Sequence, residues 1–186
     1  MTPEYGWNMA DVWELATAVG PDRVAQAQGP RRTTWHEFDG RASGLSASFL
    51  DSGLGHQSKV AVYLYSCPEF MESYYAAMKG SFVPLNINYR YGPEEVRYIL
   101  DDSDAEAVVF HATFAPVLDE IRPKLSKIRR WYVVDDGAEA PDWATRYEDA
   151  VTASSARPHV PWKRSGEDLV LLYTGGTTGM PKGVMW

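Results

Sequence analysis

Cysteine is almost absent from this sequence, since Cys67 is the only one among 186 residues. A single thiol excludes an intramolecular disulfide and is typical of the reducing cytoplasm, which is the location we predict. The four histidines are scattered, so no Cys/His group has the spacing of zinc ligands. The sequence therefore excludes a disulfide-stabilised secreted domain and argues against a zinc site.

Positive charge and long apolar runs are also scarce. The formal net charge is -7, and this acidic balance disfavours binding to nucleic acid or to an anionic lipid surface. No apolar run approaches the roughly 20 residues that span a bilayer, so we expect no transmembrane segment. Residues 1–19 contain no lysine or arginine and include Glu4, Asp11 and Glu14, so we expect no signal peptide.

The rest of the composition is that of a folded domain. Apolar residues make up 45% of the chain and charged residues 23%, close to the globular average. From about residue 56 onward, strand-like and helix-like segments alternate. This alternation predicts an α/β fold with a mostly parallel sheet and helices on both faces.

Apolar periodicity and the Gly, Pro and capping residues give the expected elements. We expect strands at residues 59–65, 82–85, 107–110, 130–134 and 168–173, and a hairpin of 23–27 with 31–34. We expect helices at residues 9–19, 35–51, 93–100, 115–125 and 147–151, and one more directly after the strand at 59–65.

Two details of these helices are predicted from local patterns. Ser66 and Glu69 have the spacing of a capping box, in which both side chains satisfy free backbone amides. The helix that follows is expected to bury a stripe of large apolar side chains, namely Phe70, Met71, Tyr74, Tyr75 and Met78. In the N-terminal helix the apolar residues at helical spacing are Met9, Val12, Trp13, Ala16 and Val19.

Ligands of parallel sheets bind at the carboxyl ends of the strands, which directs attention to the loop after Tyr173. Residues 173–183 read Tyr-Thr-Gly-Gly-Thr-Thr-Gly-Met-Pro-Lys-Gly. Glycines let backbone amides approach phosphate oxygens, and threonine hydroxyls add donors and a ligand for magnesium. Lys182 adds a compact positive charge. This composition predicts a phosphate-binding loop.

Two common phosphate motifs do not fit this loop. The Walker A pattern requires Gly-Lys-Ser/Thr, whereas Pro181 precedes Lys182 here and Gly183 follows it. The dinucleotide pattern G-x-G-x-x-G lacks a Pro-Lys pair. A plain Gly/Thr turn between two strands is the alternative interpretation.

The loop instead resembles the phosphate-binding signature of the AMP-forming adenylating enzymes, which include acyl-CoA synthetases, firefly luciferase and the adenylation domains of peptide synthetases. It departs from that signature at Gly175, where the family more often has Ser or Thr, so one hydroxyl donor is lost. Residues 78–90, Met-Lys-Gly-Ser-Phe-Val-Pro-Leu-Asn-Ile-Asn-Tyr-Arg, resemble a second block of the same family. This block is more similar to fatty acyl-CoA synthetases than to amino acid adenylation domains.

The resemblance implies a reaction in which a carboxylate attacks the α-phosphate of ATP and the CoA thiol then displaces AMP. It implies ATP, Mg²⁺ and CoA as cofactors and co-substrates, and a fatty or related hydrophobic carboxylic acid as the partner. The resemblance further implies that Thr174 helps to ligate magnesium. Tyr89, Arg90 and Tyr91 would border the acyl or nucleotide pocket. The residues implied to bind the ATP phosphates are Thr174, Gly175, Gly176, Thr177, Thr178, Gly179 and Lys182.

The resemblance also implies that residues 1–186 are the N-terminal portion of the AMP-binding domain, ending just after the phosphate-binding loop. The catalytic lysine would lie in a C-terminal domain outside it, so we expect no catalytic residue and no acyl-CoA formation by this chain alone. Residues 184–186 would form an unpaired strand, and such an open edge invites pairing with a second copy. The alternatives are a non-catalytic relative that binds ATP or a partner chain, and a ligase for aryl or short-chain acids.

Three other groups have both functional and plain interpretations. Cys67 is either an activated nucleophile or, as we favour, a small residue at a helix cap. Asp101, Asp102 and Asp104 indicate a polar turn rather than a metal site. A basic cluster either meets a phosphate of CoA or, as we favour, is a solvated helix end. Its members are Arg122, Lys124, Lys127, Arg129 and Arg130.

Overall fold

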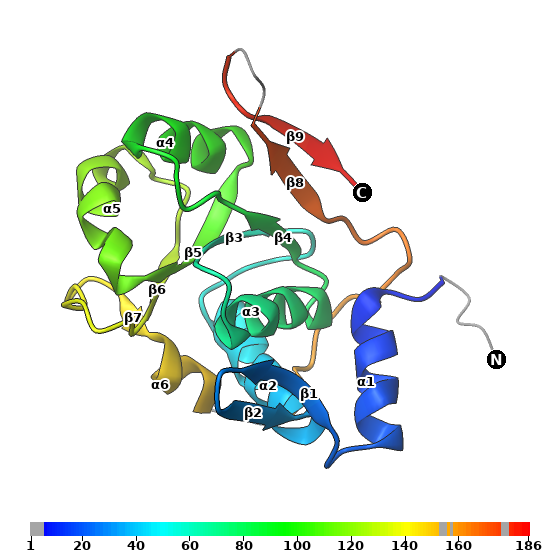
Figure 1. Cartoon of the computed structure of the whole chain (residues 1–186). Helices are drawn as coiled ribbons and strands as arrows, with labels where there is room; N and C mark the ends of the chain where they lie inside the picture. The colour runs from blue at the N-terminus through cyan, green and yellow to red at the C-terminus, as the bar shows by residue number, and fades with distance from the viewer. Residues whose placement is uncertain (1–5, 153–155, 157, 176–178) are drawn as a thin grey trace.

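A computed structural model describes residues 6–152, 156, 158–175 and 179–186 (Figure 1). Its centre is a seven-stranded sheet with the order β7-β6-β5-β3-β4-β8-β9, and β1 and β2 form a separate hairpin. The strands are β1 Val24–Gln28, β2 Arg31–Thr34, β3 Lys59–Tyr63, β4 Val83–Asn86, β5 Ala105–His111, β6 Arg130–Val134, β7 Thr145–Arg146, β8 Leu171–Thr174 and β9 Lys182–Met185. The α-helices are α1 Met9–Val19, α2 Trp35–Asp51, α3 Pro68–Lys79, α4 Pro93–Asp102, α5 Ala115–Ile121 and α6 Tyr147–Thr152.

Every strand pair of the large sheet is parallel except β8 with β9. The expectation of a mostly parallel α/β sheet is therefore confirmed. Helices cover both faces, with α1, α2, α3 and α6 on one and α4 and α5 on the other (Figure 1). None of the helices in the described ranges combines enough length with enough apolar character to cross a bilayer.

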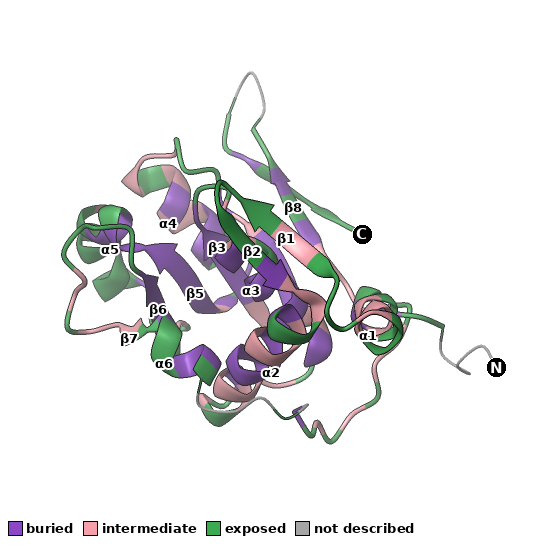
Figure 2. Ribbon diagram, turned by 60° about the horizontal axis from the view of Figure 1, so that its bottom comes forward, coloured by how far each residue is buried: buried purple, intermediate pink, exposed green. Residues whose placement is uncertain are grey.

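The core has two layers because side chains alternate along each central strand. Val60 and Val62 of β3 point into the cluster beneath α2 and α3, whereas Ala61 and Tyr63 point into the cluster beneath α4 and α5. All four residues are at most 1% exposed, and Figure 2 shows this buried centre in purple. Burial on both faces explains why β3 is a continuous apolar run in the sequence.

The pairing of the C-terminal strand differs from the prediction. Residues 184–186 are not an unpaired strand, because Leu172 faces Val184 in the antiparallel ladder of β8 and β9. The ladder continues beyond the strands, where Val170 and Trp186 exchange two backbone hydrogen bonds of 2.9 Å. The free edge of the sheet is consequently the outer side of β9, where Met185 and Trp186 are more than 70% exposed.

The start of α3 also differs from the prediction. Cys67, not Ser66, is the N-cap residue, and no side chain caps the helix. The carboxylate of Glu69 pairs with Arg31 of β2 instead of returning to the cap, so the predicted capping box does not form. Half-burial and Glu69 raise the pKa of the Cys67 thiol to about 12, which leaves it protonated and supports the plain interpretation of this cysteine.

The buried face of α3 mixes apolar and charged residues, so the predicted apolar stripe is confirmed only in part, at the fully buried Tyr75. Met71 is 40% exposed, and the predicted Phe70, Tyr74 and Met78 are only partly buried. The fully buried positions include Glu72 and Lys79. These charges are tolerated because they are paired. Glu72 accepts hydrogen bonds from Arg41 and from Tyr147, both at 2.9 Å, and Lys79 donates to Asp39 at 2.6 Å.

Helix α1 forms over the predicted residues, but its apolar spacing does not mark the buried face. Ala10 is fully buried and Trp13 packs against the core, whereas Met9, Val12 and Val19 are 50%, 46% and 73% exposed. The apolar residues that the spacing selected therefore lie on two sides of the helix.

Several boundaries differ by a few residues, and two of these differences have a local cause. The helix predicted over 115–125 ends at Ile121 and continues as a 3₁₀ turn, Arg122–Lys124, that contains Pro123. Proline cannot donate a backbone hydrogen bond, which ends the α-helical pattern. The strand predicted over 168–173 begins at Leu171, because Asp168 lies in a turn where it accepts bonds from Ser165 N at 3.1 Å and Gln57 Nε2 at 3.2 Å.

Candidate functional site

The carboxyl ends of the parallel strands β3, β4, β5 and β8 meet at one edge of the sheet. Thr174 is the last residue of β8 and Lys182 the first of β9, and the two are direct partners across the hairpin. Gly175 and Gly179 lie in the connecting loop, and all four residues are exposed. The structure therefore brings together four of the seven residues predicted to bind phosphate. Gly176, Thr177 and Thr178 lie outside the described residues.

The backbone of this loop requires glycine at one described position. Gly179 has a φ of +98°, which side-chain-bearing residues rarely adopt, and nothing lies within 4 Å of where its Cβ would be. Lys182 extends from the adjacent strand as an exposed positive charge. An exposed hydroxyl, an exposed ammonium and a glycine-rich turn at the carboxyl edge of a sheet are the components of an anion site.

Tyr173 fixes the base of the hairpin. Its hydroxyl donates a hydrogen bond of 2.8 Å to Asp102, the last residue of α4. Its ring lies against Gly183, where an added Cβ would be 3.0 Å from Tyr173 Cζ. Burial and Asp102 both raise the pKa of the Tyr173 phenol, so it remains a donor. No local pattern in the sequence links these three residues, and Asp102 acts here as a hydrogen-bond acceptor.

Aromatic side chains line the neighbouring strand ends. Tyr63 stacks on Phe114 with ring centroids 4.1 Å apart, and Tyr65 lies 5.0 Å from Phe114. His111 accepts a hydrogen bond of 3.0 Å from the backbone amide of Tyr65 through Nδ1. Burial lowers the pKa of His111, so its ring is neutral and carries its proton on Nε2. Sequence reasoning gave this histidine no role because no residue type near it in the chain suggested one.

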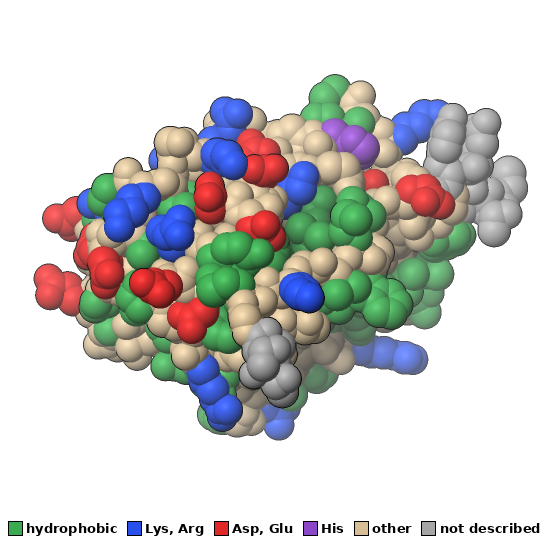
Figure 3. Space-filling view, turned by 90° about the horizontal axis from the view of Figure 1, so that it is seen from above, with side chains coloured by type: hydrophobic (Ala, Val, Ile, Leu, Met, Phe, Trp, Pro, Cys, Tyr) green, Lys and Arg blue, Asp and Glu red, His purple; other side chains and the backbone are tan. Residues whose placement is uncertain are grey.

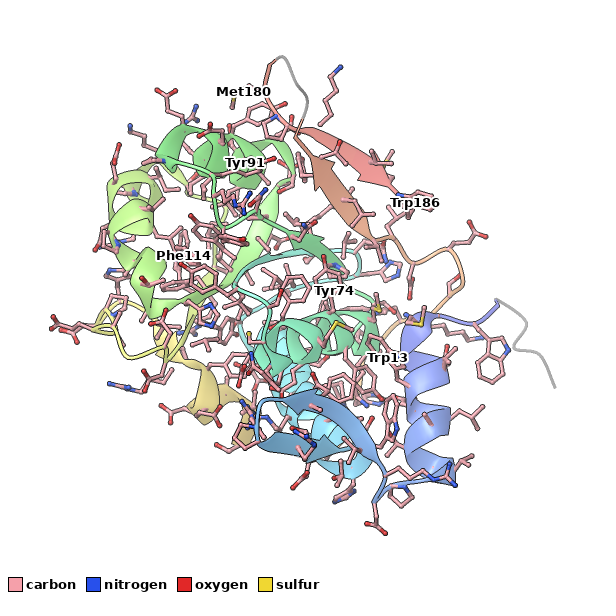
Figure 4. All side chains as sticks on the ribbon, viewed as in Figure 1. Trp13, Tyr74, Tyr91, Phe114, Met180 and Trp186 are labelled. Atoms are coloured by element: carbon pink, nitrogen blue, oxygen red, sulfur yellow. The ribbon has the colours of Figure 1, made fainter. Side chains whose placement is uncertain are left out.

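Tyr91, the residue that follows the second block of the resemblance, lies beside the loop. Tyr91 follows β4, which pairs with β8, and its hydroxyl lies next to Gly175. Figure 4 shows Tyr91 toward the same end of the molecule as Met180 of the loop. Asn86, at the end of β4, has a buried Oδ1 atom with no hydrogen-bond partner among the described residues.

The basic cluster is largely neutralised by neighbouring carboxylates. Lys127 lies 2.5 Å from Asp104, and Arg129 lies 2.9 Å from Glu106. Acidic and basic side chains are intermingled on the face seen in Figure 3. The cluster is therefore solvated, but only Arg122 and Lys124 lie at a helix end, because Arg130 begins β6.

The described residues contain no group of three or more His, Cys, Asp or Glu side chains that could hold a metal ion. Thr174 is the predicted magnesium ligand within the described part of the chain. A hydroxyl oxygen suits magnesium, which keeps several waters and shares phosphate oxygens in nucleotide sites. The exposed position of Thr174 is compatible with this form of coordination.

Comparison with known sequences agrees with the resemblance. The profile of a family described as AMP-binding enzyme matches residues 13–186. The chain is 39% identical over 190 residues to the medium-chain acyl-CoA ligase Mig of Mycobacterium avium, with 94% of this chain and 34% of that protein covered. It is 35% identical over 183 residues to the 3-oxocholest-4-en-26-oate–CoA ligase of Rhodococcus rhodochrous, with 96% and 33% covered. The chain thus spans about a third of the length of the curated relatives it matches.

Solved structures share the fold. The anthranilate CoA ligase AuaEII superposes with a TM-score of 0.89 at 24% identity, over 98% of this chain and 35% of that one. The N-terminal domain of FACL13 from Mycobacterium tuberculosis superposes with a TM-score of 0.82 at 26% identity, over 96% and 44%. The profile covers residues 13–186, and acyl-CoA ligases above 30% identity match nearly all of the chain. This chain therefore belongs to the AMP-binding enzyme family.

Proposed function

We propose that this chain forms the ATP-phosphate-binding part of an acyl-CoA ligase that activates a fatty or related hydrophobic carboxylic acid. The observation that carries the proposal is the pairing of Thr174 with Lys182 across a hairpin whose loop opens at the carboxyl edge of the sheet. The relatives support the activity, since one is named a medium-chain acyl-CoA ligase and another a 3-oxocholest-4-en-26-oate–CoA ligase.

In the proposed reaction a carboxylate oxygen attacks the α-phosphorus of ATP and pyrophosphate leaves, which gives an acyl-adenylate. The sulfur of CoA then attacks the acyl carbon and AMP leaves. This chain serves the first half, because the Lys182 ammonium and the loop amides stabilise negative charge on the departing pyrophosphate. The residues that we assign to the phosphates are Thr174, Gly175, Gly176, Thr177, Thr178, Gly179 and Lys182.

Magnesium, when bound, would neutralise part of the charge on these phosphates. We assign the Thr174 hydroxyl to it as one ligand. Lys182, the cross-strand partner of Thr174, would contact the phosphates from the neighbouring strand. Removal of magnesium is expected to weaken nucleotide binding, while the Lys182 contribution remains.

The proposal extends to the organisation of the chain. We assign residues 1–186 to the N-terminal portion of the AMP-binding domain, because the family profile matches residues 13–186 and the chain spans about a third of its relatives. On this assignment the chain alone does not form acyl-CoA. A second copy pairing along the free edge of β9, and a cytoplasmic location, stay predictions.

An acid panel tests the proposed activity. The complete gene product and the 186-residue chain are each incubated with Mg-ATP, CoA and either a medium-chain fatty acid, a short-chain acid or an aryl acid. We expect thioester formation by the complete product with the fatty acid, and none by the 186-residue chain. The Lys182→Ala variant, purified in the same way, is the control for contaminating ligases. Turnover of the aryl or short-chain acid alone would contradict the substrate class, and thioester formation by the 186-residue chain would contradict its assignment as a part.

A further inference from the structure

Gly175 is not required by its own backbone. Its φ angle lies outside the left-handed region that favours glycine, unlike that of Gly179. A side chain at position 175 is instead blocked, because a Cβ added there would lie 2.9 Å from Tyr91 Oη. The next Tyr91 atom, Cζ, would be 4.0 Å away, which is an ordinary contact distance. The hydroxyl of Tyr91 alone therefore occupies the space that a side chain at position 175 would use.

Tyr91 is held in this place by the sheet. Its carbonyl oxygen accepts a hydrogen bond of 3.2 Å from the Tyr63 hydroxyl, and its amide donates to Asn88 O at 3.0 Å. Its side chain packs against the core cluster beneath α4 and α5. Because the backbone is anchored to β3, the Tyr91 hydroxyl can yield to a side chain at position 175 only by turning away from the loop.

The Tyr91 hydroxyl is also available for bonding. The structure records no hydrogen-bond partner for it among the described residues, although the hydroxyls of Tyr63 and Tyr173 each have one. It adjoins Gly175, which directly follows the exposed Thr174. A free phenol beside an anion-binding turn is a hydrogen-bond donor for a phosphate oxygen.

We propose that the Tyr91 hydroxyl supplies the side-chain donor that position 175 lacks and hydrogen-bonds to a phosphate oxygen of the bound nucleotide. This inference rests on the proposed function, because it requires the loop to hold a phosphate. Tyr91 and Gly175 then form a matched pair, in which the absence of a side chain at one position makes room for the hydroxyl of the other.

Calorimetric titration of Mg-ATP into the 186-residue chain and four variants tests this pairing. Tyr91→Phe removes only the hydroxyl and is expected to weaken binding roughly tenfold. Gly175→Ser alone is also expected to weaken it, because the new side chain displaces the Tyr91 hydroxyl. The double variant Tyr91→Phe/Gly175→Ser regains both space and a hydroxyl, and is expected to bind more tightly than either single variant. The double variant Tyr91→Phe/Gly175→Ala regains space alone and is expected to bind like Tyr91→Phe.

Two controls separate this inference from the proposed function. Tyr98→Phe, on α4, is expected to bind like the unmodified chain, and Lys182→Ala reports on the loop itself. If Lys182→Ala weakens binding but Tyr91→Phe does not, the assignment of Tyr91 is wrong and the phosphate loop stands. Equal binding by the two double variants would also overturn it, because the pair would then serve packing only. A folded chain that binds no Mg-ATP would overturn both.

Discussion

The Tyr173 hydroxyl donates a hydrogen bond to Asp102 that joins the strand ending in Thr174 to the C-terminal end of α4. This contact, together with the ring of Tyr173 against Gly183, fixes the base of the phosphate-loop hairpin to the rest of the domain. The position of the loop therefore depends on a side chain that does not itself reach the proposed ligand.

Tyr173→Phe removes that hydrogen bond and keeps the ring. We expect it to lower the free energy of unfolding by about 1 kcal/mol, because Asp102 loses a hydrogen bond and must rely on water. Urea unfolding followed by circular dichroism measures the change. Tyr98→Phe is the control, since no hydrogen bond of the Tyr98 hydroxyl is recorded within the described residues. Equal losses in the two variants would show that the bond to Asp102 contributes nothing.

Gly183→Ala tests the other contact of Tyr173. Its new Cβ would lie 3.0 Å from Tyr173 Cζ and must displace a ring whose hydroxyl is held by Asp102. We expect a loss of about 1–3 kcal/mol, the usual result of overpacking. Gly55→Ala is the matched control, because nothing lies within 4 Å of its Cβ position and its φ is ordinary. A Gly183→Ala protein as stable as Gly55→Ala would contradict the close packing.

Arg41 is expected to be essential for the stability of the helical layer. It holds the fully buried Glu72, and burial already raises the pKa of that carboxylate despite the pairing. Arg41→Ala would leave Glu72 with only the half-exposed Arg31, 4.0 Å away, as a cation, and we expect a loss of about 3 kcal/mol by urea unfolding. Lys127→Ala, which breaks exposed pairs with Asp101 and Asp104, is expected to change stability by less than about 0.5 kcal/mol.

The Arg41 prediction has an internal check. Adding Glu72→Gln to Arg41→Ala removes the poorly compensated charge and keeps the shape of the side chain, including an acceptor for the hydrogen bond from Tyr147. The double variant is therefore expected to be more stable than Arg41→Ala. If Glu72→Gln instead adds its own loss, the buried charge is not the cause.

His111 makes stability depend on pH. Burial lowers its pKa from the ordinary 6.5, so below that pH the unfolded chain binds a proton that the folded protein excludes. The contribution of neutral His111 to the free energy of unfolding is therefore fully present above pH 6.5. It is lost as the pH falls from 6.5 through the pKa of His111 in the folded protein. We expect the urea midpoint to fall between about pH 7.5 and about pH 5.5, and to fall less in His111→Asn, which keeps an acceptor for Tyr65 N. An equal fall in both proteins would exclude His111 as a cause.

The sequence predicted the parts of this fold that depend on local patterns. The strand over 130–134 matches β6 residue for residue, because the apolar run that follows Arg130 is bounded by charged residues on both sides. The loop between β8 and β9 was predicted to bind phosphate from its composition and from its resemblance to the adenylating enzymes, and that role stays a prediction. The structure then placed Thr174 and Lys182 side by side.

The parts that the sequence did not predict depend on residues far apart in the chain. The buried face of α3 contains Glu72 because Arg41, 31 residues earlier, neutralises it. Hydrophobic periodicity cannot detect such a pair, and it selected the exposed Met71 instead. The contact of Tyr91 with Gly175 follows from the parallel pairing of β4 with β8, which local periodicity does not specify.

Calorimetric titration of Mg-ATP into the folded 186-residue chain, beside Lys182→Ala and Lys127→Ala, tests the central claim most directly. Lys127 is an exposed lysine that pairs with Asp104, so its removal controls for the loss of one positive charge. The account predicts saturable binding, roughly tenfold weaker in Lys182→Ala and unchanged in Lys127→Ala. Equal binding by the unmodified chain and Lys182→Ala, or no binding by a chain that circular dichroism shows to be folded, would contradict it.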